Sequence, residues 1–223
     1  MHGKPTRAAA VDTGAPLGLY EILEPAGEPE LIHRETREGE AILDLGCGTG
    51  RITHALAALG RRVVAVDMDP AMLEHVHGAE TVLARIEELD LGRLFGGVLL
   101  MSNLVNNPDD ERRHALLLAC RRHVSASGVV LVQRLHPESG LDPTPTEREL
   151  GGVIIRTSDV RREGPFLYVT IDYDGGARGS WRVRLEGARV LSDDDVLAEL
   201  GTARLRFLRW LDPERRWFAA APA

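Results

Sequence analysis

The sequence has only two cysteines, Cys47 and Cys120, in 223 residues. Two cysteines cannot build the disulfide framework of a small secreted protein, and neither stands in a metal-binding spacing with other cysteines or histidines. Long apolar runs are also missing, since no segment approaches the roughly 18 continuous apolar residues of a membrane helix and the apolar stretch near the start is too short for a signal peptide. We therefore expect a cytoplasmic protein with no membrane partner and no metal site.

Positive charge is in deficit as well, with 27 Lys and Arg residues against 34 Asp and Glu residues. A formal net charge of -7 gives no general attraction for a phosphate backbone, so nucleic acid is not an expected partner. The length suits one domain with one substantial core. Residues 1–16 carry Gly, Pro and Ala without periodicity and are expected to form a mobile arm, followed by a single domain over residues 17–223.

Apolar runs of strand length alternate with amphipathic runs of helix length between residues 40 and 135. The alternation predicts parallel strands joined by right-handed helical crossovers, which is an α/β fold with a Rossmann-like, doubly wound, mostly parallel sheet. Strands are expected at 41–45, 62–67, 96–102 and 128–135, and helices at 51–60, 70–78 and 109–124. Residues 17–39 also show helical spacing and precede this pattern.

The composition changes after residue 137. Residues 138–152 carry Pro and Gly and are expected to form a loop, and three runs rich in β-branched and aromatic residues follow. These runs predict a small antiparallel β insert over residues 150–187. Ser192, with Asp195 at the capping-box spacing, is expected to begin a helix that ends at Gly201, and the chain closes with a C-terminal antiparallel hairpin.

Three glycines, Gly46, Gly48 and Gly50, follow one expected strand and precede one expected helix. Such glycines let the main chain turn with positive φ, so that a nucleotide-like ligand can lie against bare main chain at a helix N-terminus. The next strand ends in Asp67, where a carboxylate can hold ribose hydroxyls. A dinucleotide is disfavoured, because Arg51 stands where the dehydrogenase fingerprint has its last glycine. A dehydrogenase remains the least favoured alternative.

Acidic residues surround this glycine loop: Asp44 lies two residues before Gly46, and Asp67 and Asp69 end the next strand. They would repel a pyrophosphate and suit a ligand that carries an ammonium and a sulfonium. The segments LDLGCGTG and VVAVDMDPAML closely resemble the cofactor-binding signature of class I S-adenosylmethionine-dependent methyltransferases. The resemblance extends in element order over residues 40–135, and more loosely over the end of the chain. It implies that the cofactor is S-adenosylmethionine.

By this resemblance, the methionine part of the cofactor lies along Asp44, Gly46 and Gly48. Asp67 is then expected to hold both ribose hydroxyls, and Met68 to pack on the adenine. The complete set of cofactor-binding residues that the resemblance implies is Asp44, Gly46, Cys47, Gly48, Asp67, Met68, Ile86 and Asn103.

Acceptor contacts are expected from the loops after the fourth and fifth strands, because ligands of a doubly wound sheet bind beyond the carboxyl ends of its strands. Asn106 and His136 are the candidate catalytic residues, His136 because imidazole titrates near neutral pH. Asn107, Arg134 and Tyr20 are the candidate acceptor-binding residues. Each has a plainer alternative role: turn formation for the asparagines, solvation for His136 and packing for Tyr20.

The resemblance has two further structural consequences. It implies that residues 17–39 form a helical lid over the cofactor, and that the insert at 150–187 either roofs the acceptor or forms a homodimer contact. The chain departs from the family at Arg85 and Gly97, where many relatives have an acidic residue. These departures limit what can be carried over about the acceptor.

The resemblance implies an enzyme that transfers the methyl group to nitrogen or oxygen of a small specialised metabolite or a short peptide. A sulfonium already activates the methyl group, so in-line alignment and exclusion of water suffice and no covalent enzyme intermediate is needed. The leading alternative is a noncatalytic scaffold that binds S-adenosylmethionine to stabilise a partner.

Overall fold

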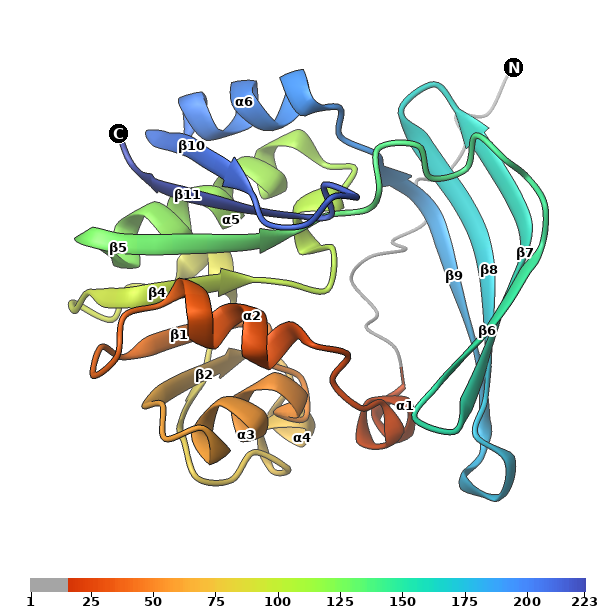
Figure 1. Ribbon diagram of the computed structural model, residues 1–223, viewed down its shortest axis with the longest axis horizontal. Coiled ribbons are helices and arrows are strands. Elements are labelled where there is room, and N and C mark those ends of the chain that lie inside the picture. Colours follow the sequence, from red (N-terminus) through yellow and green to blue (C-terminus); the bar gives the residue numbers. More distant parts are fainter. Residues whose placement is uncertain (1–15) are drawn as a thin grey trace, which may run out of the picture.

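A seven-stranded sheet forms the centre of the computed structural model, which describes residues 16–223 (Figure 1). Its strand order is β10-β11-β5-β4-β1-β2-β3, parallel from β3 to β5 and antiparallel at β11 and β10. The strands are β1 (Ile42–Leu45), β2 (Val63–Asp67), β3 (Glu80–Leu83), β4 (Phe95–Leu100), β5 (Val124–Gln133), β10 (Leu205–Trp210) and β11 (Trp217–Pro222). The predicted Rossmann-like, mostly parallel sheet with a C-terminal antiparallel hairpin is confirmed.

Helices cover both faces of this sheet (Figure 1). They are α1 (Leu17–Ile22), α2 (Glu28–Glu35), α3 (Arg51–Ala58), α4 (Pro70–Leu73), α5 (Asp110–His123) and α6 (Asp193–Thr202). Alternate residues of β4 enter two different cores: Val98 packs with α5 and α6, whereas Leu99 packs with α2 and α3. Because both faces are buried, the central strands are continuous apolar runs rather than alternating ones.

Local capping explains where several helices begin. The Asp109 side chain accepts hydrogen bonds from the main chain at the start of α5, and Ser192 forms the predicted capping box with Asp195. The helix α6 runs to Thr202, one residue beyond the predicted end. The helix expected at 70–78 is only the single turn of α4, because the chain then folds back to pack Val76 in a small core under the glycine loop.

A second, four-stranded antiparallel sheet stands beyond the carboxyl ends of the parallel strands (Figure 1). Its strands are β6 (Thr146–Leu150), β7 (Val153–Glu163), β8 (Phe166–Asp174) and β9 (Ser180–Arg189). The sheet thus extends beyond the predicted 150–187 insert at both ends. The strand β6 lies in the segment that we expected to be a loop, because its residues are mostly exposed and polar. Pairing with β7 orders it through main-chain bonds and through side-chain contacts such as that of Glu147 with Arg156 at 2.6 Å.

The predicted N-terminal arm over residues 1–16 falls outside the described residues, except for Pro16. Between Pro16 and the C-terminus, no helix combines the length and the apolar character needed to cross a membrane. The cytoplasmic location stays a prediction.

Candidate functional site

The glycine loop lies where the strand order reverses. The strand β1 is flanked by β2 and β4, so the loops that leave β1 and β4 diverge and open a crevice, which is where doubly wound sheets bind ligands. Gly46 has φ of 76° and Gly48 has φ of 55°, values that side-chain-bearing residues rarely adopt. A Cβ added to Gly46 would lie 2.8 Å from Cδ1 of Leu104, so close approach across the crevice also requires glycine there.

Asp44 is fully buried at the base of this loop. Its Oδ2 accepts a hydrogen bond of 2.7 Å from the Thr53 hydroxyl, but its buried Oδ1 has no hydrogen-bond partner within the described chain. Burial raises the pKa of the Asp44 carboxyl to about 6, against the opposing effects of the Thr53 hydrogen bond and the Arg51 charge. A buried carboxylate oxygen without a donor is costly, and a cationic ligand would supply the missing partner.

Asp67 ends β2 and holds the glycine loop from the other side. Its Oδ2 accepts a hydrogen bond of 2.8 Å from Gly48 N, and its Oδ1 accepts one of 3.0 Å from Asp69 N. Beside it, the apolar side chains of Met68 and Leu83 are 47% and 59% exposed. Asp67 and Leu83 are register partners at the ends of β2 and β3. A carboxylate next to exposed apolar side chains suits a ribose with its attached base.

Ile86 completes this apolar region at the start of a short 3-10 helix, η1 (Ile86–Glu88). A Cβ on Gly46 would also be 3.6 Å from Cδ1 of Ile86, so the Ile86 side chain borders the glycine loop. Arg85, the residue before it, is exposed and pairs with Glu87 at 3.2 Å. The arginine at the expected acidic position is therefore turned to a neighbouring carboxylate.

The loop after β4 contains two successive non-glycine residues with positive φ: Ser102 at 53° and Asn103 at 59°. Such conformations cost on the order of 1–3 kcal/mol each for residues other than glycine, although asparagine tolerates them better than most. The Gln133 side chain accepts a hydrogen bond of 2.9 Å from Ser102 N, and Asn103 O accepts one of 2.8 Å from Asn106 N. The next residues form the 3-10 helix η2 (Leu104–Asn106). Asn103 thus faces the glycine loop across the crevice through its own turn.

Asn106 and Asn107 are buried and have framework contacts. Asn106 Nδ2 donates 2.6 Å to Arg189 O, and its Oδ1 accepts 2.8 Å from Leu135 N. Asn107 Oδ1 accepts 2.9 Å from Asp109 N at the start of α5. Both carboxamides are thus buried and join loops within the protein, and the catalytic role of Asn106 and the acceptor-binding role of Asn107 stay predictions that these contacts do not favour.

Arg134, the predicted acceptor-binding residue after β5, is enclosed within the protein. Its side chain has no exposed surface and lies 4.4 Å from the centre of the Trp210 ring. The guanidinium donates to Arg215 O at 2.8 Å, to Leu191 O at 2.8 Å and to Asp193 Oδ1 at 2.6 Å. An acceptor cannot reach a guanidinium that is enclosed in this way, so Arg134 joins the end of β5 to the segment that follows β9.

His136 lies in the loop after β5 and is half-buried. Its Nδ1 is 3.1 Å from Glu138 N, which is a donor, so the neutral ring carries its proton on Nε2. In that tautomer Nε2 donates a hydrogen bond and cannot take a proton from an acceptor. The contact favours an orienting role for His136 over the predicted role as a general base.

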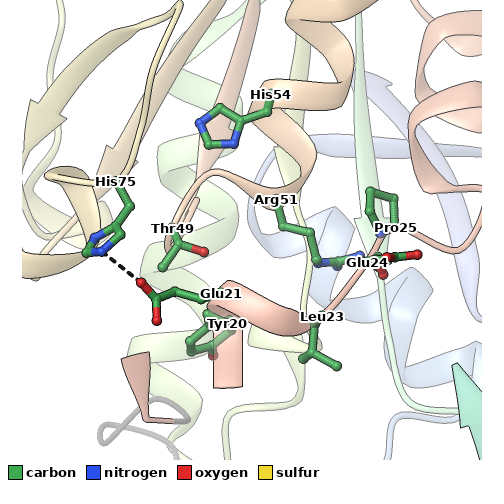
Figure 2. A pocket seen from close by; sticks show the side chains of 9 residues that line it. All are labelled: Tyr20, Glu21, Leu23, Glu24, Pro25, Thr49, Arg51, His54 and His75. Carbon is green, nitrogen blue, oxygen red and sulfur yellow. Dashed lines mark hydrogen bonds and ion pairs between the residues drawn. The ribbon is translucent and has the colours of Figure 1, made fainter. Parts of the chain in front are cut away.

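Tyr20 connects the N-terminal helices to the glycine loop. Its ring packs against Gly48, 3.7 Å from where a Cβ would lie. The segment lines a cavity of about 420 Å³. The side chains that line it are those of Tyr20, Glu21, Leu23, Glu24, Pro25, Thr49, Arg51, His54 and His75 (Figure 2). Two side-chain contacts hold the segment: Glu21 lies 3.0 Å from Nε2 of His75, and Glu28 forms an ion pair with Arg51 at 3.0 Å. Both contacts join the segment to residues beside the glycine loop, and the role of residues 17–39 as a lid stays a prediction.

The remaining predicted residue of the loop, Cys47, is buried beside Ala65 and Val76. Burial, together with the charges of Asp44 and Asp67, raises the pKa of its thiol far above the usual range. A thiol that does not ionise near neutral pH is no nucleophile, so Cys47 fills space behind the loop.

Gly46 borders Ile86 and Leu104, Gly48 contacts Tyr20 and Asp67, and Asp44 lies buried at the base of the same loop. The cofactor-binding roles of these residues, and those of Met68 and Asn103, stay predictions. Sequence reasoning missed Leu83, Leu104 and Gln133, which lie at or just after strand ends and carry no motif. The sequence alone also gave no reason for the two glycines of β4, Gly96 and Gly97. A Cβ on Gly97 would lie 2.6 Å from the Thr36 methyl group, and one on Gly96 would collide with Glu40. These glycines make room for the end of α2.

Residues 42–128 match the methyltransferase domain family. The cypemycin N-terminal methyltransferase of a Streptomyces species is 32% identical over 107 residues, which cover 45% of this chain and 44% of that protein. The ubiquinone biosynthesis O-methyltransferase of Xanthomonas oryzae pv. oryzae is 27% identical over 135 residues, 56% of this chain and 55% of that protein. The chain thus spans about half the length of these relatives.

A solved structure extends the likeness over the whole chain. The sugar N-methyltransferase from a Streptoalloteichus species superposes with a TM-score of 0.73 at 22% identity, over 100% of this chain and 98% of that one. At this identity the likeness concerns the fold, including the second sheet. The matched segment is therefore similar to a methyltransferase domain, and the chain as a whole has the fold of that solved N-methyltransferase.

Proposed function

We propose that the protein transfers the methyl group of S-adenosylmethionine to nitrogen or oxygen of a small specialised metabolite or a short peptide. The observation that carries the proposal is the buried, unpartnered Oδ1 of Asp44 beside the glycine loop. A carboxylate oxygen in that position lacks a cationic donor, and the ammonium of the cofactor has that character.

The residues of the crevice fit the cofactor. Asp44 would meet the charged methionine end, Asp67 the ribose hydroxyls, and Met68 with Leu83 the two sides of the adenine. When bound, S-adenosylmethionine supplies a methyl group that its sulfonium already activates. The chain itself then needs to orient the acceptor and exclude water, and the Tyr20 segment over Gly48 is placed to do the latter.

The acceptor side is proposed to be the second sheet. Both ends of β9 reach the crevice: Trp181 packs against Gly18 of the lid, and Arg189 O accepts from Asn106 in the loop after β4. The residues of β9 that alternate with its exposed charges are half-buried and apolar: Trp181, Val183 and Leu185. An acceptor lying beside β9 would meet these side chains.

The tautomer of His136 favours an amine acceptor. A neutral amine attacks with its own lone pair and releases its proton to solvent afterwards, whereas a hydroxyl benefits from a base during the transfer. Since Nε2 of neutral His136 carries a proton, it would orient the acceptor by donating a hydrogen bond. Relatives of both kinds exist, with N- and O-methyltransferases among the similar proteins.

Two experiments test the proposal. Calorimetry with S-adenosylhomocysteine should show one binding site, and incubation with methyl-labelled cofactor and a panel of amines, hydroxyl compounds and short peptides should label at least one acceptor. Absence of binding would refute the function altogether. Binding without transfer to any acceptor, including those in an extract of the source cells, would instead favour the noncatalytic scaffold. A homodimer through the second sheet stays a prediction, for which the molecular mass in solution is the measurement.

A further inference from the structure

The turn after β4 is the most strained main chain beside the crevice. Ser102 and Asn103 both have left-handed φ values, 53° and 59°, although neither is glycine. Successive non-glycine residues in this region persist only when their surroundings hold them. The question is which contact does so.

The far end of the turn is fixed inside the protein. Asn106 is buried there and makes hydrogen bonds to Arg189 O and Leu135 N. The near end is exposed at Ser102, and its main-chain N–H has one side-chain acceptor, Oε1 of Gln133 at 2.9 Å. Gln133 is the last residue of β5, which is hydrogen-bonded to β4. Its carboxamide therefore reaches across from the neighbouring strand to the strained residues.

The turn determines what stands opposite the glycine loop. Leu104, the residue after the strained pair, places its Cδ1 over Gly46, within 2.8 Å of where a Cβ would lie. Rotation of Ser102 or Asn103 out of the left-handed region would redirect the main chain and move Leu104 from this place. A main-chain hydrogen bond of 3.1 Å from Leu104 N to Met101 O closes the turn, and the contact between Gln133 and Ser102 is the side-chain contact that supports it.

We propose that Gln133 is a positioning residue for the cofactor: by accepting the Ser102 N–H, it holds the Ser102–Asn103 turn in the form that closes the crevice opposite Gly46. The inference rests on the proposed function, since it assumes that S-adenosylmethionine occupies this crevice. Gln133 acts through the turn and need not touch the cofactor.

The test compares two substitutions. Gln133→Met keeps the length of the side chain and removes the accepting oxygen, whereas Gln133→Glu keeps an accepting oxygen at the same place. We expect Gln133→Met to bind S-adenosylhomocysteine about three- to tenfold more weakly, the loss that one hydrogen bond implies. Amide hydrogen exchange at residues 102–106 should become faster in this variant. Gln133→Glu should match the wild type in both measurements, and all three proteins should share one midpoint of thermal unfolding.

Three outcomes would overturn the proposal: unchanged affinity and exchange in Gln133→Met, equal losses in Gln133→Met and Gln133→Glu, or a loss of affinity accompanied by general destabilisation. The last outcome would mean a merely structural role. If the wild type itself fails to bind S-adenosylhomocysteine, the proposed function falls and this inference with it. Wild-type binding with an unaltered Gln133→Met variant removes this inference alone.

Discussion

The two sheets of the protein are built on opposite principles. Around the glycine loop of the seven-stranded sheet, the Asp44 carboxyl is fully buried, and Ser102 and Asn103 have strained main-chain conformations. Both features cost free energy of folding. Among its described residues, the four-stranded sheet has no fully buried carboxylate, and its strained non-glycine main chain is confined to Asp159 in β7, with φ of 53°. Its outer face carries exposed ion pairs such as Arg182 with Asp172 at 2.7 Å, and its inner face is apolar and half-buried.

The match to the methyltransferase domain covers residues 42–128, which hold β1 to β4 and the start of β5, and it includes none of the four-stranded sheet. A cofactor that is charged and always the same can be bound by a buried charge and a fixed main chain. An acceptor that differs between enzymes is better bound by side chains that can be substituted without loss of the fold. The buried Asp44 and the strained turn at Ser102 and Asn103 should therefore determine how the cofactor binds. The inner face of the second sheet should determine how the acceptor binds. The following predictions test that division.

The largest effect is expected at Asp44. Asp44→Asn should weaken binding of S-adenosylhomocysteine at least about 30-fold, because a buried charge partner of the ligand ammonium is lost. Without ligand, the same variant should be more stable than the wild type at pH 7, by on the order of 1–3 kcal/mol, since burying the ionised carboxylate is a cost that asparagine avoids. Calorimetry and thermal unfolding measure the two effects. Asp194→Asn, at an exposed carboxylate of α6, is the control and should change neither.

The raised pKa of Asp44, about 6, gives this prediction a pH dependence. Above that value the carboxylate is ionised and attracts the ligand, so affinity should be level from pH 7 upward and fall as the pH drops through 6. Stability without ligand should change in the opposite sense: a raised pKa means that the folded state binds the proton more tightly, so Asp44's contribution declines as pH rises from about 4 to about 6. A wild-type affinity that is independent of pH would contradict the role of Asp44.

The cofactor crevice was more accessible from the sequence than the rest because its determinants are local. Gly46, Gly48 and Asp67 lie within 22 residues of one another, in a strand, turn and helix pattern that the sequence spells out directly. The partners of Asn106 and Arg134 are remote instead: Asn106 bonds to Arg189, 83 residues away, and Arg134 to Leu191, 57 residues away. No local pattern shows that such a side chain will be enclosed.

Substitution of Arg134 tests the contact between the end of β5 and the segment that follows β9. Arg134→Met should lower the free energy of unfolding by about 3 kcal/mol, because it leaves Leu191 O and Arg215 O without their buried donor and leaves Asp193 with Arg215 as its remaining ion-pair partner. Arg134→Lys should recover little of this, since an ammonium cannot reproduce the planar fork. Chemical denaturation measures the change, and the exposed Arg206→Met provides the baseline. If Arg134→Met were as stable as the wild type but failed only with acceptor, the acceptor-binding role would return.

The second sheet should affect the acceptor alone. Val183→Glu places a charge on the inner face and should raise KM for the acceptor about tenfold or more, whereas Arg184→Glu, on the outer face of the same strand, should leave it unchanged. Both variants should bind S-adenosylhomocysteine like the wild type. Steady-state kinetics with the acceptor found in the labelling experiment, together with calorimetry, separates the two faces. Equal effects of the two substitutions would mean that the acceptor does not lie against this face.

The smallest effect is expected at the lid, where the two sheets meet. Gly18 packs on Trp181 of the second sheet, while Glu21 pairs with His75 beside the glycine loop. Glu21 and His75 are partly exposed, and such pairs contribute about 0.2–1 kcal/mol, so Glu21→Gln should weaken S-adenosylhomocysteine binding by no more than about fivefold. The rate of ligand release, followed by stopped-flow fluorescence of the protein's tryptophans, should rise by a similar factor, because a lid with one fastening opens more often. Glu38 is an exposed glutamate after α2, and Glu38→Gln should leave both the affinity and the release rate of S-adenosylhomocysteine unchanged. A Glu21→Gln variant that releases ligand at the wild-type rate would show that packing of Tyr20 and Trp181 alone holds the lid. The cofactor site and the acceptor site would then be coupled through apolar contact rather than through charge.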